Sequence, residues 1–376
     1  MNRHIRMLAL MCLVAVPAIP AFADTMAPRT LIAREGKGYL EKVGSQLVLH
    51  LKGSPEEMGR QHGTLLKDHI SENIKVIKAK ANESGMMVEA TLDMIWRKQT
   101  EFVPKRYVKE MRALADASGV DFDTIRRANC IPEMFHCSGF AVFGKATKGG
   151  TLYHGRILDY GVEMGLQDHA VVIIAEPEGF APFVNVGYAG FIGSVTGMNL
   201  KQMGFGEIGG SAIGPYEGVP MAFLMRRGLE ETSTLEEART LFRDNKRTCE
   251  YYYVVSDAKI PSALAVGATA RKIEFLGPNE ANERLDVPIE DAVVLSENER
   301  YKLLTQRVKD GYGNLDSSAC LGLMKRPVAT RNCLHCVLMS PGTGELWVAH
   351  ATSSGEPASE QAYTYLDIKT LMAREP

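Results

Sequence analysis

The sequence has almost no net charge, because 43 lysines and arginines are balanced by 45 aspartates and glutamates to give a formal charge of −2. This balance is unlike that of proteins that hold nucleic acid on a basic surface, so we expect no nucleic-acid partner. The seven cysteines among 376 residues have scattered spacings. A chain of this length also buries enough core without cross-links, so the sequence does not indicate a disulfide scaffold.

Repeats, low-complexity tracts and long linkers are absent from the sequence. A phosphate-binding loop is absent too, since the glycines at 204–210 are not followed by a Lys-Ser or Lys-Thr pair. A composition of 45% hydrophobic and 23% charged residues is instead typical of a globular protein.

The amino terminus has the pattern of a signal peptide at residues 1–23. Arg3 and Arg6 precede an apolar run at 7–16, and Ala21 and Ala23 supply the small residues of a cleavage site. The run is shorter than the roughly 20 residues that span a membrane. We therefore expect an exported protein, periplasmic or secreted, with no stable membrane insertion.

The remaining chain divides into a helical part and a part rich in strands. An alternating strand at 44–52 is followed by helical periodicity through much of 55–130. From Phe140 the pattern changes to short apolar or β-branched runs with a few helical blocks, which favours an α+β layered fold. Strands are predicted at 140–143, 151–157, 170–175, 183–188, 191–196, 251–256, 262–267, 271–276, 292–295 and 336–340, and helices at 220–245, 298–309 and 316–324. Within the first of these helical blocks, Ser233 and Glu236 fit a capping box.

Three reactive side chains occupy a predicted hairpin. Cys137 begins its first strand, and Arg156 and Asp159 lie at the end of the returning strand. A nearby cation increases the thiolate fraction of a cysteine, and a carboxylate can orient an amine that carries a proton. The alternative is a buried structural cysteine beside a surface ion pair, and spacing alone does not decide between the two.

Several segments in chain order resemble one enzyme group. These are 53–63 (GSPEEMGRQHG), 110–129, the ribbon of Cys137-Ser138 with 155–160 (GRILDY), and 189–199 (AGFIGSVTGMN). They are similar to the N-terminal-nucleophile (Ntn) hydrolases of the choloylglycine-hydrolase and acid-ceramidase kind. Within that group they resemble the acyl-CoA:6-aminopenicillanate acyltransferase-like (C45 peptidase) family.

The resemblance implies a four-layer αββα sandwich with an N-terminal helical segment. It divides the chain into the signal peptide, a helical pro-segment or N-terminal part at 24–136, and a core at 137–376. It also implies self-cleavage between His136 and Cys137, which makes Cys137 the nucleophile and its new α-amine the base. Arg156 and Asp159 fall on the family's arginine and aspartate, and no cofactor or metal is implied.

Several groups in the sequence are candidates for stabilising the oxyanion. Asn298 resembles the family's asparagine between a strand and a helix, although it also fits a helix N-cap. Asn199 is a second candidate whose alternative is a turn-stabilising role. Backbone amides near Gly209 are a third source of donors. Glu207 either faces the cleft or is a solvated strand residue.

Cys333, His335 and Cys336 form a short cluster that invites a metal or redox interpretation. A zinc site needs about four ligands, and only this pair of cysteines is closely spaced. Residues i and i+3 of a regular strand also face opposite sides. We therefore favour structural roles for these three residues.

Together these features predict an exported cysteine Ntn hydrolase that cleaves a small-molecule N-acyl amide, or transfers its acyl group, through a thioester. A non-catalytic binding protein on the same scaffold is an alternative from a different functional class. An ester or lipid hydrolase is a third hypothesis. The sequence does not define the acyl chain, the head group or the oligomeric state.

Overall fold

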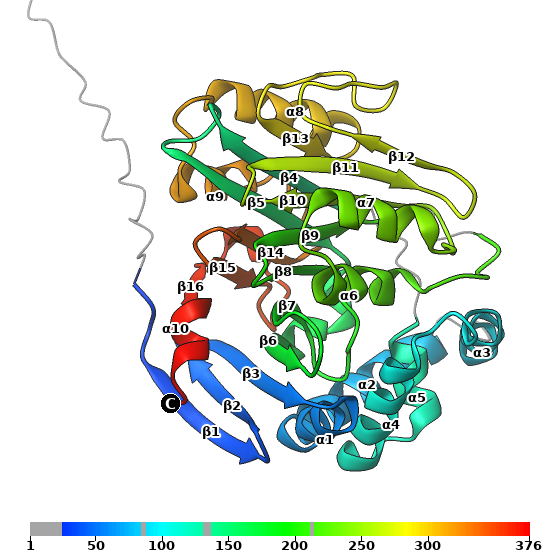
Figure 1. Cartoon of the computed structure of the whole chain (residues 1–376). Coiled ribbons are helices and arrows are strands. Elements are labelled where there is room, and N and C mark those ends of the chain that lie inside the picture. Colours follow the sequence, from blue (N-terminus) through cyan, green and yellow to red (C-terminus); the bar gives the residue numbers. More distant parts are fainter. Residues whose placement is uncertain (1–24, 84–87, 131–136, 211–213) are drawn as a thin grey trace, which may run out of the picture.

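The computed structural model describes residues 25–83, 88–130, 137–210 and 214–376. Two β-sheets pack face to face, and helices cover the outer face of each sheet (Figure 1). The predicted αββα sandwich is confirmed. The signal peptide predicted at 1–23 lies outside the described residues.

The first sheet contains ten strands in the order β1-β2-β3-β6-β7-β8-β9-β10-β11-β12. Only the β3–β6 pair is parallel, and the other neighbours are antiparallel. Strands from before and after Cys137 therefore share one sheet. Their bounds are β1 (Arg29–Glu35), β2 (Gly38–Val43), β3 (Gln46–Gly53), β6 (Ala170–Pro177), β7 (Phe183–Tyr188), β8 (Thr196–Asn199), β9 (Met203–Ile208), β10 (Tyr251–Asp257), β11 (Ser262–Ala268) and β12 (Ile273–Leu276).

The second sheet has six antiparallel strands in the order β13-β4-β5-β14-β15-β16. The predicted hairpin is its centre, because β4 pairs with β5 through a turn that uses Gly149 and Gly150 at positive φ. The bounds are β4 (Ser138–Gly144), β5 (Gly150–Asp159), β13 (Ala292–Leu295), β14 (Cys333–Ser340), β15 (Glu345–His350) and β16 (Thr364–Asp367).

The helices fall into three groups. The amino-terminal group packs beside β1–β3, and its first helix begins with a capping box between Ser54 and Glu57. It comprises α1 (Pro55–Leu65), α2 (Lys67–Glu83), α3 (Val88–Gln99), α4 (Lys105–Ser118) and α5 (Phe122–Ala128). Helices α6 (Met221–Glu231) and α7 (Leu235–Asp244) cover the ten-stranded sheet. Helices α8 (Asn298–Asp310) and α9 (Ser317–Leu323) cover the six-stranded sheet, and α10 (Ile368–Ala373) follows β16.

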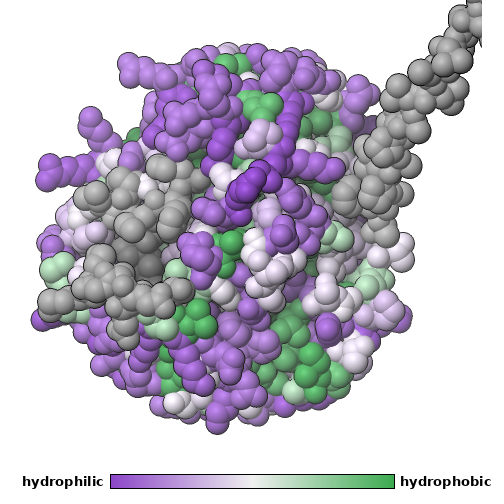
Figure 2. All heavy atoms as spheres, turned by 180° about the vertical axis from the view of Figure 1, so that it is seen from behind, coloured by the Kyte–Doolittle hydropathy of each residue, from purple (hydrophilic) through white to green (hydrophobic). Residues whose placement is uncertain are grey.

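Apolar side chains fill the space between the layers. One core lies between β4 and β5 and the helices α8 and α9, and includes Phe140, Ile157 and Leu304. A second lies between the two sheets and includes Val172 and Val337. The surface seen from behind is mostly hydrophilic, with hydrophobic atoms in separate small areas (Figure 2). Among the described residues, no helix combines the length and apolarity needed to cross a membrane.

Two local predictions are wrong. Residues 191–195 form no strand but a loop that is held by side-chain amides, since Asn185 Nδ2 donates to Gly193 O and Asn129 Oδ1 accepts from Ile192 N. The residue that caps α7 is Thr234 rather than Ser233, because the Thr234 hydroxyl accepts from the backbone of Glu237. In both cases side-chain hydrogen bonds decide the local structure.

Candidate active site

Cys137 lies immediately before β4 and is fully buried. The β4–β5 ladder pairs Ser138 with Ile157 and Gly139 with Arg156. Its continuation by one residue places Cys137 opposite Leu158, between Arg156 and Asp159 along β5. The predicted thiol, guanidinium and carboxylate are therefore brought to the same end of the ribbon.

The three side chains do not share one face of the sheet. Neighbouring residues of a strand point to opposite faces. Leu158 and Cys137 belong to the core that reaches between the sheets, whereas Ile157 packs toward α8 and α9. Cys137 and Arg156 therefore face inward, and Ser138 and Asp159 face the helix layer.

On the inner face, Arg156 forms an ion pair with Glu207 of β9. Arg156 Nη2 lies 3.3 Å from Glu207 Oε2, and both side chains are fully buried. Glu207 is therefore not a solvated strand residue, because it lies between the sheets. The Arg156 charge also affects His154, whose pKa is lowered to about 3 by burial and then by this nearby cation.

On the outer face, Asp159 is held by Arg300 and Thr330. Arg300 Nη2 donates to the Asp159 carboxylate, and Asp159 Oδ1 accepts from the backbone and hydroxyl of Thr330 at 3.0 and 2.9 Å. Arg300 Nη2 also donates to Ser138 Oγ at 2.8 Å, and this hydroxyl lies 2.6 Å from Ser296 Oγ. Arg300 thus joins Ser138, which follows the predicted nucleophile, to the predicted aspartate.

Arg300 was not predicted from the sequence, although Asn298, two residues earlier, was a candidate. Asn298 begins α8 in the left-handed backbone region (φ 51°), and its side chain is exposed. No hydrogen bond of that side chain is found within the part of the chain that the structure describes. The N-cap alternative is wrong, because Glu297 occupies the N-cap position.

Asn199 has a structural role. Its Nδ2 donates to the carbonyls of Leu229 and Thr232, and its Oδ1 accepts from the backbone of Lys201 and Met203. Because both amide hydrogens and both oxygen lone pairs are used, this side chain has no donor left for an oxyanion. The oxyanion candidacy of Asn199 is corrected to the turn-stabilising alternative.

The other predicted positions are partly described. Gly209 follows β9 directly and is buried, so its backbone lies one residue beyond the end of that strand. His136 lies outside the described residues, and so the predicted cleavage bond is not described.

An apolar pocket is lined by a residue of β5 near Cys137. Leu158, opposite Cys137 in the ladder, lines a cavity of about 100 Å³ with Tyr188, Phe191 and Met221. The Tyr188 hydroxyl lies 3.1 Å from His335 Nδ1, and His335 Nε2 lies 3.0 Å from Thr196 Oγ1. The pocket therefore combines apolar walls with a few polar side chains, of which the Tyr188 hydroxyl is held by His335.

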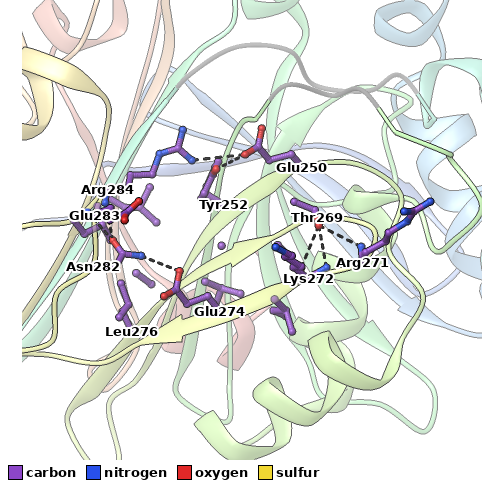
Figure 3. A pocket seen from close by; sticks show the side chains of 17 residues that line it. Glu250, Tyr252, Thr269, Arg271, Lys272, Glu274, Leu276, Asn282, Glu283 and Arg284 are labelled. Carbon is purple, nitrogen blue, oxygen red and sulfur yellow. Dashed lines mark hydrogen bonds and ion pairs between the residues drawn. The ribbon is translucent and has the colours of Figure 1, made fainter.

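A larger charged groove lies over β10, β11 and β12 and reaches β13, the strand that pairs with β4. It has a volume of about 970 Å³, and its lining includes Leu295, which pairs with Gly139. Figure 3 shows Arg284, Glu250 and Tyr252 together at one part of this groove. The Tyr252 hydroxyl donates to Glu250, and the Arg284 guanidinium lies 4.1 Å from the centre of the Tyr252 ring. The pocket thus reaches Leu158, opposite Cys137, and the groove reaches Leu295, opposite Gly139, while Cys137 itself lines neither.

The cluster at Cys333, His335 and Cys336 differs from a regular strand. A β-bulge between Cys333 and His335 pairs Cys333 with Asp159 and Cys336 with Ile157. Both cysteines therefore face the same side, and their sulfurs are 3.3 Å apart. The expectation that they face opposite sides is wrong, because the extra residue shifts the alternation. No group of three or more metal-ligating side chains occurs among the described residues.

Several known proteins have sequences similar to parts of this chain. No family model matches the chain. It is 30% identical to protein dcd1B of Dictyostelium discoideum over 255 residues, which cover 59% of this chain and 51% of that protein. It is 25% identical to acid ceramidase of Rattus norvegicus over 180 residues, which cover 41% of this chain and 45% of that protein. The predicted resemblance is confirmed.

The chain spans about half the length of the two relatives. A solved structure, the Caenorhabditis elegans ortholog of N-acylethanolamine-hydrolyzing acid amidase, is 16% identical with a TM-score of 0.43, and the match covers 55% of this chain and 93% of that one. The finer assignment to the C45 family stays a prediction.

Proposed function

We propose that the protein is an exported Ntn amidohydrolase whose nucleophile is the Cys137 thiol and whose substrate is an N-acyl amide. The observation that carries this proposal is the position of Cys137. It immediately precedes β4, at the end of the ribbon that carries the buried Arg156–Glu207 pair and the fixed Asp159 carboxylate, and Leu158 opposite it lines an apolar pocket. The similarity to acid ceramidase supports an amide as the scissile bond.

In the proposed reaction, cleavage before Cys137 first provides a free α-amine. An α-amine has a pKa near 8, so it can take the thiol proton close to neutral pH. The sulfur attacks the amide carbonyl, the C–N bond breaks, and the ammonium returns its proton to the leaving amine. Water then hydrolyses the thioester, or an amine accepts the acyl group.

Arg156 and Arg300 have different roles in this scheme. The Arg156 charge lies on the same face as the thiol and favours the thiolate. Arg300 acts as a positioning residue, because its bonds to Asp159 and Ser138 fix the carboxylate beside the strand end that carries the amine. Backbone amides near Gly209 are the proposed oxyanion donors, since Asn199 is used elsewhere.

The apolar pocket and the charged groove are the basis for placing the two parts of the substrate. We assign the acyl group to the apolar pocket lined by Leu158 and Met221, because burial of hydrocarbon there is favourable. We assign the amine portion to the charged groove, where Arg284 and Glu250 offer groups of both signs. A polar or charged leaving group is therefore preferred over an apolar one.

The proposal is tested on the purified full chain. Mass spectrometry is expected to find a fragment that begins at Cys137, and Cys137→Ala is expected to abolish it. A panel of N-acyl amides and matching esters, with varied acyl length and either charged or neutral amines, then measures turnover. Hydrolysis of amides with charged amines, lost in Cys137→Ala, is the expected result.

The matched control is Cys249→Ala, because Cys249 is also a buried free thiol but lies outside the site. This variant is expected to keep both cleavage and turnover. Turnover that persists in Cys137→Ala would refute the nucleophile. An intact wild-type chain that hydrolyses amides would refute only self-cleavage. No turnover, together with slow alkylation of Cys137 by iodoacetamide, would favour the binding-protein alternative.

A further inference from the structure

Cys333 and Cys336 form a pair of thiols that the proposed reaction does not use. Their sulfurs are 3.3 Å apart, and both residues are fully buried. Both lie in the core beneath α8 and α9, away from the thiol of Cys137 on the inner face. Two thiols this close within one strand call for an explanation of their own.

The β-bulge brings the backbones of the two cysteines within reach of a covalent bond. Cys333 pairs with Asp159 and Cys336 with Ile157, which are two residues apart on β5. Two residues of a strand span about 6.6 Å at about 3.3 Å per residue. Disulfides usually join Cα atoms about 4.4–6.8 Å apart. A regular strand would separate residues i and i+3 by about 10 Å and point them to opposite faces.

The environment of Cys333 is unsuited to catalysis and to metal binding. Burial raises the pKa of the Cys333 thiol well above its ordinary value, and the neighbouring Cys336 adds to this. Such a thiol is a poor nucleophile and a poor metal ligand, because both roles need the thiolate. Within the described residues, the pair also lacks the further ligands of a metal site.

We propose that Cys333 and Cys336 form an intramolecular disulfide that staples the β14 bulge next to Asp159. The oxidant is a disulfide, either glutathione disulfide or a protein disulfide. One cysteine thiolate attacks it and releases one thiol. The second thiolate then attacks the mixed disulfide and releases another, so two cysteine S–H bonds are exchanged for one S–S bond and two reduced thiols. Because the folded thiols are buried, the bond forms before β14 is covered.

The staple acts on the geometry of the site rather than on overall stability. Closing a ring of four residues removes little entropy from the unfolded chain. It fixes the strand that pairs with Asp159 and follows Thr330, whose backbone and hydroxyl hold that carboxylate. The reduced protein is therefore expected to fold but to hold Asp159 less firmly.

The test does not depend on amide hydrolysis. The denatured full chain is refolded with either oxidised and reduced glutathione or reduced glutathione alone, and free thiols are then alkylated with iodoacetamide in denaturant. Trypsin releases both cysteines in one peptide, because it cuts after Arg331 and next after Lys369. In the oxidised sample this peptide is expected to be unalkylated and lighter than the dithiol form by two hydrogen atoms.

Cys320 is the internal control, since it is equally buried in the same core and is expected to be alkylated in both samples. Alkylation of both Cys333 and Cys336 in the oxidised sample would overturn the proposal, as would a bond from either residue to a third cysteine. As a second readout, amide hydrogen exchange in β14 is expected to be faster in the reduced protein. Equal exchange in both samples would overturn the stapling role.

Discussion

The ion pair between Arg156 and Glu207 allows a test of how much a buried charge pair contributes to folding stability. Glu207→Gln keeps the size of the side chain but removes the charge that neutralises a fully buried guanidinium. Removing one partner of a buried pair costs about 3–5 kcal/mol of folding free energy. With roughly 350 folded residues and an unfolding entropy of about 2.1 cal/mol/K per residue, this corresponds to a fall in Tm of about 4–7 °C.

The assay is calorimetric unfolding of the wild type and three variants. Replacing both partners by methionine is expected to recover most of the lost stability, because apolar substitution of a whole buried pair is often neutral. The control is Glu274→Gln on β12, where the carboxylate is exposed and the expected change is below about 1 kcal/mol. A Glu207→Gln variant that unfolds at the wild-type temperature, or a double variant less stable than it, would refute the buried-pair reasoning.

Three further predictions concern charge, packing and turnover. Burial lowers the pKa of His62 and His154 in the folded protein to about 3, against about 6.5 in the unfolded chain. Each neutral histidine is therefore compatible with full folding stability above pH 6.5, and this stability is lost as the pH falls toward 3. Urea titrations are expected to show a loss of about 1.4 kcal/mol per pH unit for each histidine, and an unchanged stability between pH 6.5 and 4 would contradict this. Gly59→Ala is expected to destabilise the protein by about 1–3 kcal/mol, because a Cβ there lies 2.2 Å from Glu110 O, whereas Gly322→Ala meets no atom and is expected to be neutral or stabilising. Arg300→Met is expected to lower kcat at least tenfold while alkylation of Cys137 stays near the wild-type rate, and equal losses in both would indicate a general disruption of the site.

The hairpin of the site was predictable because its signals are local. Residues 140–143 and 151–157 carry strand-forming side chains, and the glycines between them provide the turn. The same holds for β13, whose bounds match the predicted 292–295. Alternation and turn residues act within a few positions, so one sequence is enough to find them.

The partners of the site residues were not predictable in the same way. Arg156 and Glu207 are 51 residues apart and meet only because two sheets stack. Arg300 reaches Asp159 across 141 residues, because α8 packs over the hairpin. No local pattern distinguishes Arg300 from an ordinary exposed helix arginine, whereas Asn298 attracted attention through a motif and is exposed.

At Cys333 and Cys336, one extra residue in a strand changes which side the following side chains face. Alternation in a strand predicts opposite faces for residues i and i+3, and it fails here because Leu334 is accommodated in a bulge. The bulge has no strong sequence signal, since none of the four residues is glycine. The bulge arises from the pairing with β5, and the sequence of β14 alone does not reveal that pairing.

In the proposed mechanism, the position of Cys137 immediately before β4 accounts for two ion pairs rather than one. The side chain of a strand residue points to one face, while its backbone nitrogen lies in the plane of the sheet. A guanidinium that acts on the sulfur must therefore lie on the inner face, as Arg156 does, and a carboxylate that orients the amine must approach at the strand end, as Asp159 does. In mid-strand the nitrogen would be used by the ladder, and the amine could not serve as a base. In the proposed mechanism, the separate fixation of Arg156 by Glu207 and of Asp159 by Arg300 would allow the thiol and the α-amine to be tuned independently.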